Sequence, residues 1–402
     1  MLNSSFVKIL IIKLMKFSLP QHSIYFSFFI YSFSLGVFFP RIADLQQQMN
    51  IGEATLGLAL LGPPIGVQIS LLFADLILEK IGFRKTMCFG IPILGLALVF
   101  SALSYLPIFF FISLLFGGFA IGILEVAVNL EADRLENKLD TKIMNRSHSF
   151  WSLGFFASGI TGALFSQMQI SPFINFSLSL VICSIFTFVF CAKYQPASKR
   201  GNPSKSKSVF VYPTKSIMGL ILLTLSPMLL ESASIDWSVI YMRDIFSTPP
   251  IVNGLSIVVL AIAQFIVRFY ADFYVERFGP IKISHVSIYI MFIGVIAVTL
   301  SSSVLISLIG FTLIGGGSAV LFPLAMSAAA QKTDRPAAVN VASLAQISFL
   351  MFLLAPPVLG FVAENFGIRV SFGIGLPMVV LSWLFINSLK NEKKVVKNKH
   401  NS

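Results

Sequence analysis

The sequence predicts an all-α polytopic membrane protein whose twelve transmembrane helices form two pseudo-symmetric six-helix bundles. Composition is the first observation behind this prediction. Of 402 residues, 56% are hydrophobic and only 11% are charged, a balance typical of membrane chains rather than water-soluble ones. The apolar residues form repeated runs of about 20, the length that a helix needs to cross a bilayer. These runs do not alternate polar and apolar residues, as the strands of a membrane barrel would.

An internal repeat indicates how the helices are grouped. Residues 73–82 (FADLILEKIG) reappear 197 positions later as residues 270–279 (YADFYVERFG). The register of the repeat extends to Lys85 and Lys282. Parallel repeats of this kind are typical of transporters that bind their substrate between two related bundles.

Apolar runs separated by short polar turns give the individual spans. We predict them at 21–42, 54–78, 87–105, 107–130, 147–168, 173–192, 216–241, 251–275, 284–302, 304–330, 340–361 and 369–389. Residues 193–215 are rich in Ser, Pro and Lys, and we expect them to form a cytoplasmic linker between the bundles at 21–192 and 216–389. Residues 1–20 are predicted to be a cytoplasmic prefix and residues 390–402 a basic cytoplasmic tail.

The distribution of basic residues predicts the orientation in the membrane. With an even number of spans, 25 of the 29 lysines and arginines fall on one side. Only Arg41, Arg243 and Arg369 fall on the other side, and Arg268 lies within a span. Cytoplasmic loops carry such an excess, so we expect both termini in the cytoplasm of an inner-membrane protein. The net charge of +12 therefore reflects topology, and no nucleic-acid partner is expected.

The beginning of the chain and the three cysteines indicate neither a signal peptide nor a metal site. Lys13 and Lys16 interrupt the first apolar run and no small-residue cleavage site follows, so a secretory signal peptide is not predicted. Translation could begin at Met15 instead of Met1. Three cysteines show no metal-ligand spacing. We expect no cofactor, no metal and no enzymatic activity.

The turn after the second predicted span resembles that of the major facilitator superfamily. The family pattern there is Gly-x-x-x-Asp-Arg-x-Gly-Arg-Lys, and residues 75–85 read DLILEKIGFRK. Asp75 stands in place of the first glycine, and Glu79 stands in place of the aspartate. The resemblance covers nearly the whole chain and implies twelve helices in two bundles that carry out secondary transport.

Three further segments resemble bacterial inner-membrane permeases related to fucose–proton symporters. They are residues 125–129 (EVAVN), residues 231–238 (ESASIDWS) and residues 356–369 (PPVLGFVAENFGIR). Those permeases also carry an acid in helix 1, where this chain has Gly36. Drug–proton antiporters of the superfamily carry an arginine in helix 4, where this chain has Leu114. The resemblance thus implies uptake of a sugar-like solute more than drug efflux.

Glu125 is the first candidate for a substrate or proton site. An unpaired charge at the centre of a membrane helix costs about 2.5–3.5 kcal/mol on insertion scales and is a functional candidate. The matching position of the second half is Pro323, so Glu125 is not part of the repeated scaffold. Asn129 follows one helical turn later on the same face. A carboxyl group here could exchange a proton on each cycle, or it could simply bond to a neighbouring helix.

The seventh span carries Glu231 and Asp236 at different depths. At 1.5 Å per residue from Ser216, Glu231 lies roughly 22 Å along the helix and Asp236 about 30 Å. Five residues separate them by about 140°, so they cannot both point at one ligand. We expect Glu231 in the cavity and Asp236 as an outer gate or structural partner of Arg243 or Arg41. Trp237 is expected to be an interfacial anchor.

Other charges lie where the repeated turns meet the cytoplasm. Arg268 precedes an aspartate by one helical turn, which can neutralise it locally. Its counterpart in the first half is Leu71, and binding of an anionic substrate is the alternative role. We assign the following residues to a cytoplasmic gate that locks the two halves in one state and releases them in the other: Asp75, Glu79, Arg84, Lys85, Arg268, Asp272 and Glu276.

Neutral polar residues complete the candidate site. Gln68, Gln264 and Gln346 suit a polar solute, although interhelical hydrogen bonds are an equal alternative. We expect a monomeric secondary transporter that works by alternating access, with proton-coupled uptake of a small sugar-like compound as the first hypothesis. Efflux of a hydrophobic compound or drug is the alternative. A non-transporting membrane receptor is the alternative of another class.

The even number of spans makes a testable statement about the chain ends. A reporter that is active only in the cytoplasm should be active when fused to either terminus. Activity at one end only would contradict the predicted topology.

Overall fold

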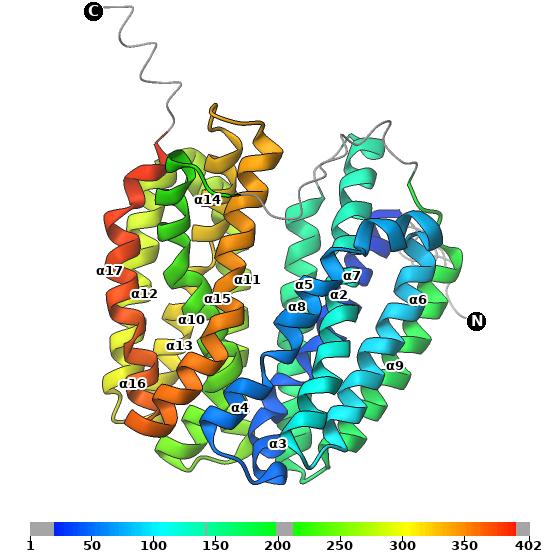
Figure 1. Ribbon diagram of the computed structural model, residues 1–402, viewed down its shortest axis with the longest axis vertical. Helices are drawn as coiled ribbons and strands as arrows, with labels where there is room; N and C mark the ends of the chain where they lie inside the picture. Colours follow the sequence, from blue (N-terminus) through cyan, green and yellow to red (C-terminus); the bar gives the residue numbers. More distant parts are fainter. Residues whose placement is uncertain (1–19, 141–142, 198–211, 391–402) are drawn as a thin grey trace, which may run out of the picture.

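The computed structural model describes residues 20–140, 143–197 and 212–390, and these ranges contain helices and connecting turns. Almost all of the predicted prefix 1–20 and tail 390–402 and most of the linker 193–215 lie outside the described residues. The described part forms two halves side by side (Figure 1).

Within the described residues, the first half contains nine helical elements. They are α2 (Pro20–Gly36), η1 (Phe39–Arg41), α3 (Ile42–Met49), α4 (Glu53–Ala59), α5 (Gly62–Leu71), α6 (Ala74–Ala102), α7 (Pro107–Leu139), α8 (Met144–Gln167) and α9 (Pro172–Lys193). Short breaks divide the helices of the first two predicted spans. The first span corresponds to α2, η1 and the start of α3, and α4 and α5 make up most of the second.

The second half begins with longer continuous helices. Its elements are α10 (Lys215–Phe246), α11 (Pro250–Phe278), α12 (Pro280–Leu300), α13 (Val304–Ser318), α14 (Leu321–Ala330), α15 (Ala337–Phe366), α16 (Ile368–Gly373), α17 (Gly375–Leu384) and η2 (Ile386–Leu389). The tenth predicted span is broken between α13 and α14, at Ala319 and Val320.

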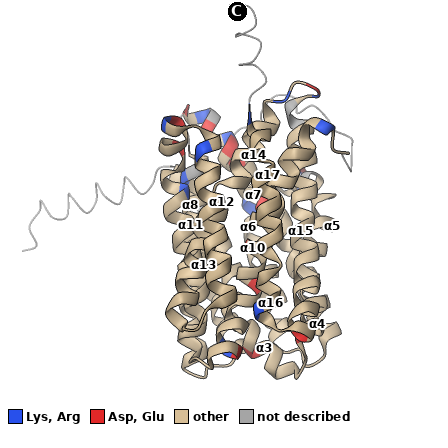
Figure 2. Ribbon diagram, turned by 90° about the vertical axis from the view of Figure 1, so that its left-hand side faces the viewer, with Lys and Arg blue, Asp and Glu red and all other residues tan. Residues whose placement is uncertain are grey.

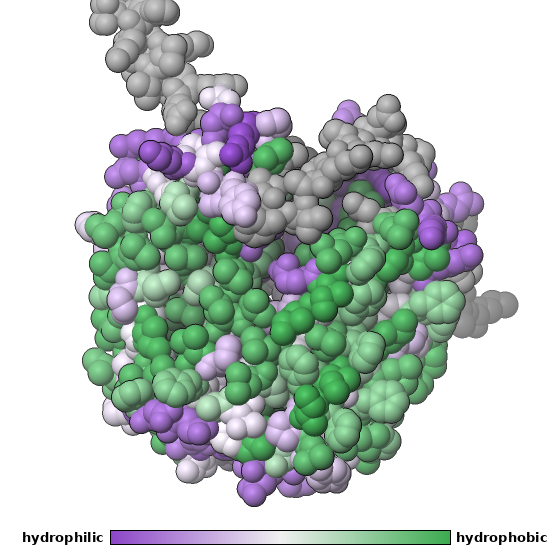
Figure 3. All heavy atoms as spheres, viewed as in Figure 1, coloured by the Kyte–Doolittle hydropathy of each residue, from purple (hydrophilic) through white to green (hydrophobic). Residues whose placement is uncertain are grey.

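The predicted all-helical architecture is confirmed. Within the described ranges, ten helical stretches are long and apolar enough to cross a membrane. Two further predicted spans correspond to α8 and to the shorter apolar stretch formed by α16 and α17. Figure 3 shows a broad hydrophobic belt with hydrophilic atoms at both ends, as expected of a protein surrounded by lipid.

The two copies of the sequence repeat have the same backbone conformation. Gly82, at a kink within α6, has φ 73° and ψ 167°, and Gly279, between α11 and α12, has φ 82° and ψ 155°. Residues with a Cβ seldom adopt positive φ, so both turns favour glycine. The backbone of the repeated turn is therefore duplicated along with its sequence.

Both described ends of the chain lie at one end of the molecule, which we call the linker end. Near the beginning of α2, the ring of Phe26 stacks on Phe190 at the end of α9, with ring centroids 3.9 Å apart. At the other terminus, Ser388 of η2 touches Gly219 in the first turns of α10. The start of α2 and the end of η2 thus lie beside α9 and α10, the two helices that residues 194–214 connect.

The two halves meet at the opposite end, which we call the junction end (Figure 1). Arg243 at the end of α10 donates from Nη2 to Oε1 of Gln46 on α3 at 2.8 Å. The amide of Ala54 at the start of α4 donates to the Glu364 carboxylate of α15 at 2.8 Å. These hydrogen bonds cross between the halves and close the junction end.

Glycines allow the helices to approach each other closely at the junction. A Cβ built on Gly57 of α4 would lie 2.4 Å from the carbonyl oxygen of Pro356 on α15. A Cβ on Gly254 of α11 would lie 2.3 Å from the Cβ of Ala163 on α8. Small residues are the usual means by which membrane helices bring their backbones together. The closed junction therefore depends on the absence of side chains at these positions.

We predict that Gly57→Ala opens the junction end. The added methyl group must push α4 away from α15, so a cysteine placed at Ala54 should react faster with a water-soluble maleimide. An increase of about tenfold would correspond to ~1.4 kcal/mol between the closed and open junctions. The measurement is a labelling time course in a background without the native cysteines.

Gly316→Ala is the matched control, since a Cβ there would meet its nearest neighbour, Val267, at an ordinary 3.6 Å. Equal labelling of the two variants would show that the Gly57 contact does not hold the junction closed.

Candidate functional site

Glu125 lies on α7 and is held by neutral hydrogen-bond donors. Asn129, one turn further along α7, donates from Nδ2 to Glu125 Oε1 at 2.8 Å and to the Glu125 carbonyl oxygen at 2.9 Å. The hydroxyl group of Tyr31 on α2 lies near enough to interact with the Glu125 carboxylate, and it also donates to the carbonyl oxygen of Ile121 at a long 3.5 Å. Tyr31 is buried, whereas Glu125 and Asn129 are half-buried. The predicted pair thus shares one helical face, and a tyrosine from a second helix joins it.

Sequence reasoning missed Tyr31. It lies in a span rich in aromatic residues, and the sequence alone does not distinguish it from Tyr25. Only the packing of α2 against α7 brings its hydroxyl group to the carboxylate.

Glu231 of α10 forms an ion pair with Arg268 of α11. Arg268 Nη2 lies 3.6 Å from Glu231 Oε1, and the side chains are 28% and 12% exposed. This separation is that of an ion pair without a direct hydrogen bond. Arg268 Nε also donates to the carbonyl oxygen of Ala319 at 3.3 Å, in the break between α13 and α14. The sequence did not predict that Arg268 would contact Glu231.

Arg268 also faces the first half of the molecule. Its positive charge acts on the His148 ring near the start of α8. Helix α8 packs against α11 along the boundary between the halves. In the space-filling view, hydrophilic atoms show between the two halves (Figure 3). Polar groups therefore line part of this boundary within an otherwise apolar protein.

The three candidate glutamines have different environments. Gln264 is buried on α11, with Nε2 at 3.5 Å from the Ser318 hydroxyl of α13, which fits the interhelical alternative. Gln346 on α15 is half-buried, and Gln68 near the end of α5 is exposed. Of the three, Gln264 lies one helical turn from Arg268 on the same helix.

Asp236 does not have the partners that the sequence suggested. Its carboxylate accepts a hydrogen bond from Ser232 at 3.1 Å. Among the described contacts, Arg41 binds Asp44 and Arg243 binds Asp244, each at 2.6 Å. Each arginine has an acidic group on its own helix or the next one, so neither needs Asp236.

The prediction that Trp237 anchors the protein at the membrane surface is wrong. Its side chain is only 1% exposed and packs against Gly360 of α15 at the junction between the halves. Glycine at position 360 leaves the space that the indole ring occupies.

The predicted gate charges flank the two repeated turns. Glu79, Arg84 and Lys85 are exposed around Gly82, and Asp272 and Glu276 are exposed before Gly279. The backbone of Asp75 is on α6, but its side chain is outside the described set. Figure 2 shows charged residues gathered at the linker end and others within the helical body. A gating role for these residues stays a prediction.

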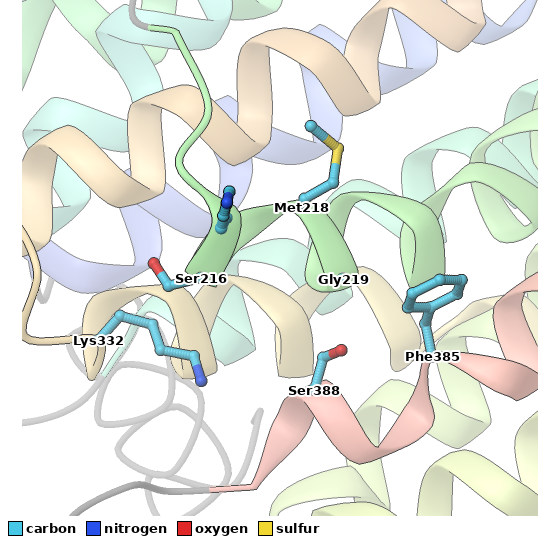
Figure 4. Close-up of a pocket in the computed structure, with 7 residues that line it drawn as sticks. Ser216, Met218, Gly219, Lys332, Phe385 and Ser388 are labelled. Atoms are coloured by element: carbon cyan, nitrogen blue, oxygen red, sulfur yellow. The ribbon is translucent and has the colours of Figure 1, made fainter.

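Two cavities open at the ends of the molecule, away from Glu125 and Glu231. One of about 430 Å³ at the junction end is lined by Gln46, Gln47, Asn50, Ile51, Gly52, Glu53, Arg243 and Asp244. The other, of about 440 Å³, lies at the linker end of the second half (Figure 4). Within the described residues, His, Cys, Asp and Glu form no group that could hold a metal ion.

Comparison with known proteins agrees with this architecture. The family model of the Major Facilitator Superfamily matches residues 24–347 and 220–401. An uncharacterised MFS-type transporter of Yersinia pestis is 27% identical over 355 residues, which cover 88% of this chain and 91% of the relative. The membrane protein MosC of Rhizobium meliloti is 23% identical over 345 residues, covering 85% and 83%.

Solved structures share the fold at low identity. A mutant of the nucleoside transporter NupG matches with a TM-score of 0.75 at 13% identity, over 92% of this chain and all of the other. A D-xylose–proton symporter matches with a TM-score of 0.69 at 12% identity, over 92% and 98%.

These matches bear on the predicted resemblance to fucose permeases as well as on the family. The Yersinia pestis relative is an uncharacterised transporter and not a fucose permease in particular, so that subgroup stays a prediction. The superfamily is one of transporters and not of enzymes. The fold has two halves with a repeated turn and helices that can span a membrane, and the family model matches most of the sequence. The chain therefore belongs to the Major Facilitator Superfamily and is a multi-pass membrane transporter.

Proposed function

We propose that this protein takes up a small, polar, sugar-like solute together with a proton, across a bacterial inner membrane and with both termini in the cytoplasm. The half-buried Glu125 carboxyl group with its neutral partners carries the proposal. Two structural neighbours, a D-xylose–proton symporter and a nucleoside transporter, fit a polar solute.

Coupling to a proton follows from the electrostatics of Glu125. Asn129 and Tyr31 can stabilise a negative carboxylate by hydrogen bonds, but they do not neutralise its charge. Closing the two halves over a charged carboxylate removes the remaining water from it, which is costly. A bound proton removes that cost. Closure with Glu125 protonated is therefore favoured over closure with Glu125 charged.

Glu231 and Arg268 have a different role in this proposal. Their charges neutralise each other, so this part of the site can close without a proton. Arg268 retains donors beyond the Nε that binds Ala319, and guanidinium N–H groups suit the oxygen atoms of a hydroxylated solute. We assign Glu231 and Arg268 to substrate binding and Glu125 to proton exchange.

Glu125→Gln should separate proton coupling from substrate binding. The amide keeps the size and the hydrogen bonding of the side chain but cannot exchange a proton. We expect uptake driven by an imposed pH gradient to fall to the level without a gradient, while exchange of labelled for unlabelled solute continues. The assay uses proteoliposomes and a solute found by thermal-shift screening of sugars, amino acids and organic acids.

The exposed Asp140 at the end of α7 provides the control, because Asp140→Asn also removes a carboxylate charge, outside both the central site and the predicted gate. A gradient response of Glu125→Gln equal to that of the wild type would refute the assignment of Glu125.

The ion pair makes a separate prediction about stability. Arg268→Gln leaves the Glu231 carboxylate without its counter-charge and should lower the free energy of unfolding by about 1–2 kcal/mol. We expect less than the ~3–5 kcal/mol of a fully buried pair because water reaches both groups. The double variant Glu231→Gln with Arg268→Gln should recover much of this loss, as measured by thermal unfolding in detergent. Additive losses in the double variant would show that the two charges do not interact.

A further inference from the structure

The cavity at the linker end of the second half combines basic, hydroxyl and apolar groups. It is lined by Lys215, Ser216, Met218 and Gly219 of α10, Lys332 of the turn after α14, Phe385 between α17 and η2, and Ser388 of η2. Figure 4 shows Lys332 extending beneath the first turn of α10, with Ser388 beneath Gly219 and Phe385 to the side of Gly219. Three segments of the second half thus build one recess.

The charge of this recess is positive in spite of a nearby aspartate. Asp334 accepts hydrogen bonds from Ser216 Oγ, Thr214 Oγ1 and Asn340 Nδ2 at 2.5, 2.6 and 2.9 Å. These bonds hold the pKa of Asp334 well below its usual range, so the group stays ionised at neutral pH. The single negative charge of Asp334 therefore offsets only part of the positive charge of Lys215 and Lys332.

Arg335 and Lys390 add positive charge around the recess. Arg335 donates to the carbonyl oxygen of Tyr212 at 2.9 Å, which ties the turn after α14 to the segment before α10. Lys390 is exposed immediately after η2. The balance of charge here thus favours an anion.

The beginning of α10 adds to this preference. The Thr214 side chain does not cap the helix, and the first turn of α10 contains no acidic residue. A helix of 32 residues carries partial positive charge at such an end, where its first amide groups can receive an anion. The α10 terminus supports the site but is only one of its components.

Apolar and aromatic side chains place the recess at the edge of the membrane. Met218 lines the recess and is 42% exposed; in Figure 4 it lies on the other side of α10 from Lys332, and Phe385 lines the recess beside Gly219. Tyr212 and Trp383, which lie close by in the chain, are 75% and 42% exposed. Tyrosine and tryptophan gather at the depth of lipid headgroups. A soluble anion would leave the apolar part of this recess uncovered, whereas a lipid would cover it.

We propose that this recess binds the phosphate group of an anionic phospholipid, held by Lys215, Lys332 and the first turn of α10, with the lipid chains running past Met218. Basic pockets between transmembrane helices are known to suit such headgroups. The site joins α10, the turn after α14 and η2, which all belong to the second half. Bound lipid therefore stabilises this half and does not depend on the transport reaction proposed above.

The test uses the full-length protein in a neutral detergent, with phosphatidylglycerol, phosphatidylcholine or inorganic phosphate added in separate titrations. Phosphatidylglycerol should raise the unfolding temperature more than phosphatidylcholine. Lys215→Gln combined with Lys332→Gln should weaken the apparent affinity for phosphatidylglycerol about thirtyfold, because both lysines that attract the anionic headgroup are lost. Lys215→Arg combined with Lys332→Arg should restore most of it.

Lys85→Gln combined with Lys282→Gln is the matched control, because it removes two exposed lysines from other turns at the same end. A similar loss of affinity in this control would overturn the site, as would equal protection by phosphatidylcholine. Protection by inorganic phosphate that equals that of phosphatidylglycerol and depends on Lys215 and Lys332 would overturn the lipid as the source of the phosphate group.

Discussion

The bilayer offers no water to a buried charge, so each charge inside this protein requires a partner from the protein itself. Arg41 shows the requirement fully met. It is 2% exposed and binds Asp44, the carbonyl oxygen of Ile170 at 2.7 Å and the side chain of Asn175 at 3.2 Å. Such a residue has little freedom to bind anything else, and we regard it as structural.

The central charges meet the same requirement less completely. Among the described residues, Glu125 has hydrogen-bond donors without a counter-charge, and Glu231 has a counter-charge at 3.6 Å without a direct hydrogen bond. Both carboxylates remain half-buried. Groups that are only partly compensated can change their protonation or their partner at a modest cost, which suits a transport cycle more than a static core.

The helices and turns could be predicted from the sequence because their signals are local. Apolar runs gave the spans, and the repeated glycine gave the turns at Gly82 and Gly279, which the structure shows in the same conformation. The pairing of Asn129 with Glu125 was also predictable, since both lie one turn apart on a single helix. For these features the interacting groups are close in sequence.

Contacts between distant segments were not predictable in the same way. The pairing of Glu231 with Arg268 depends on how α10 packs against α11, and the burial of Trp237 depends on the space beside Gly360. A local aspartate was the simplest partner for Arg268, and a surface position the commonest one for a tryptophan. Reasoning from a single sequence assigns each residue its most common environment, whereas the packing of this chain gives Arg268 and Trp237 different ones.

The repeat separates what both halves share from what each half does alone. The turns at Gly82 and Gly279 are shared, but Glu125 corresponds to Pro323 and Arg268 to Leu71. A duplicated backbone provides two bodies that can move against each other, and motion of that kind needs no charge in its centre. In our proposal, the first half contributes a charge that a proton must cancel, and the second half contributes a pair that cancels itself. Closure of the two halves then depends on one proton-binding group, so the asymmetry of the charges, and not the symmetry of the fold, links transport to the proton gradient.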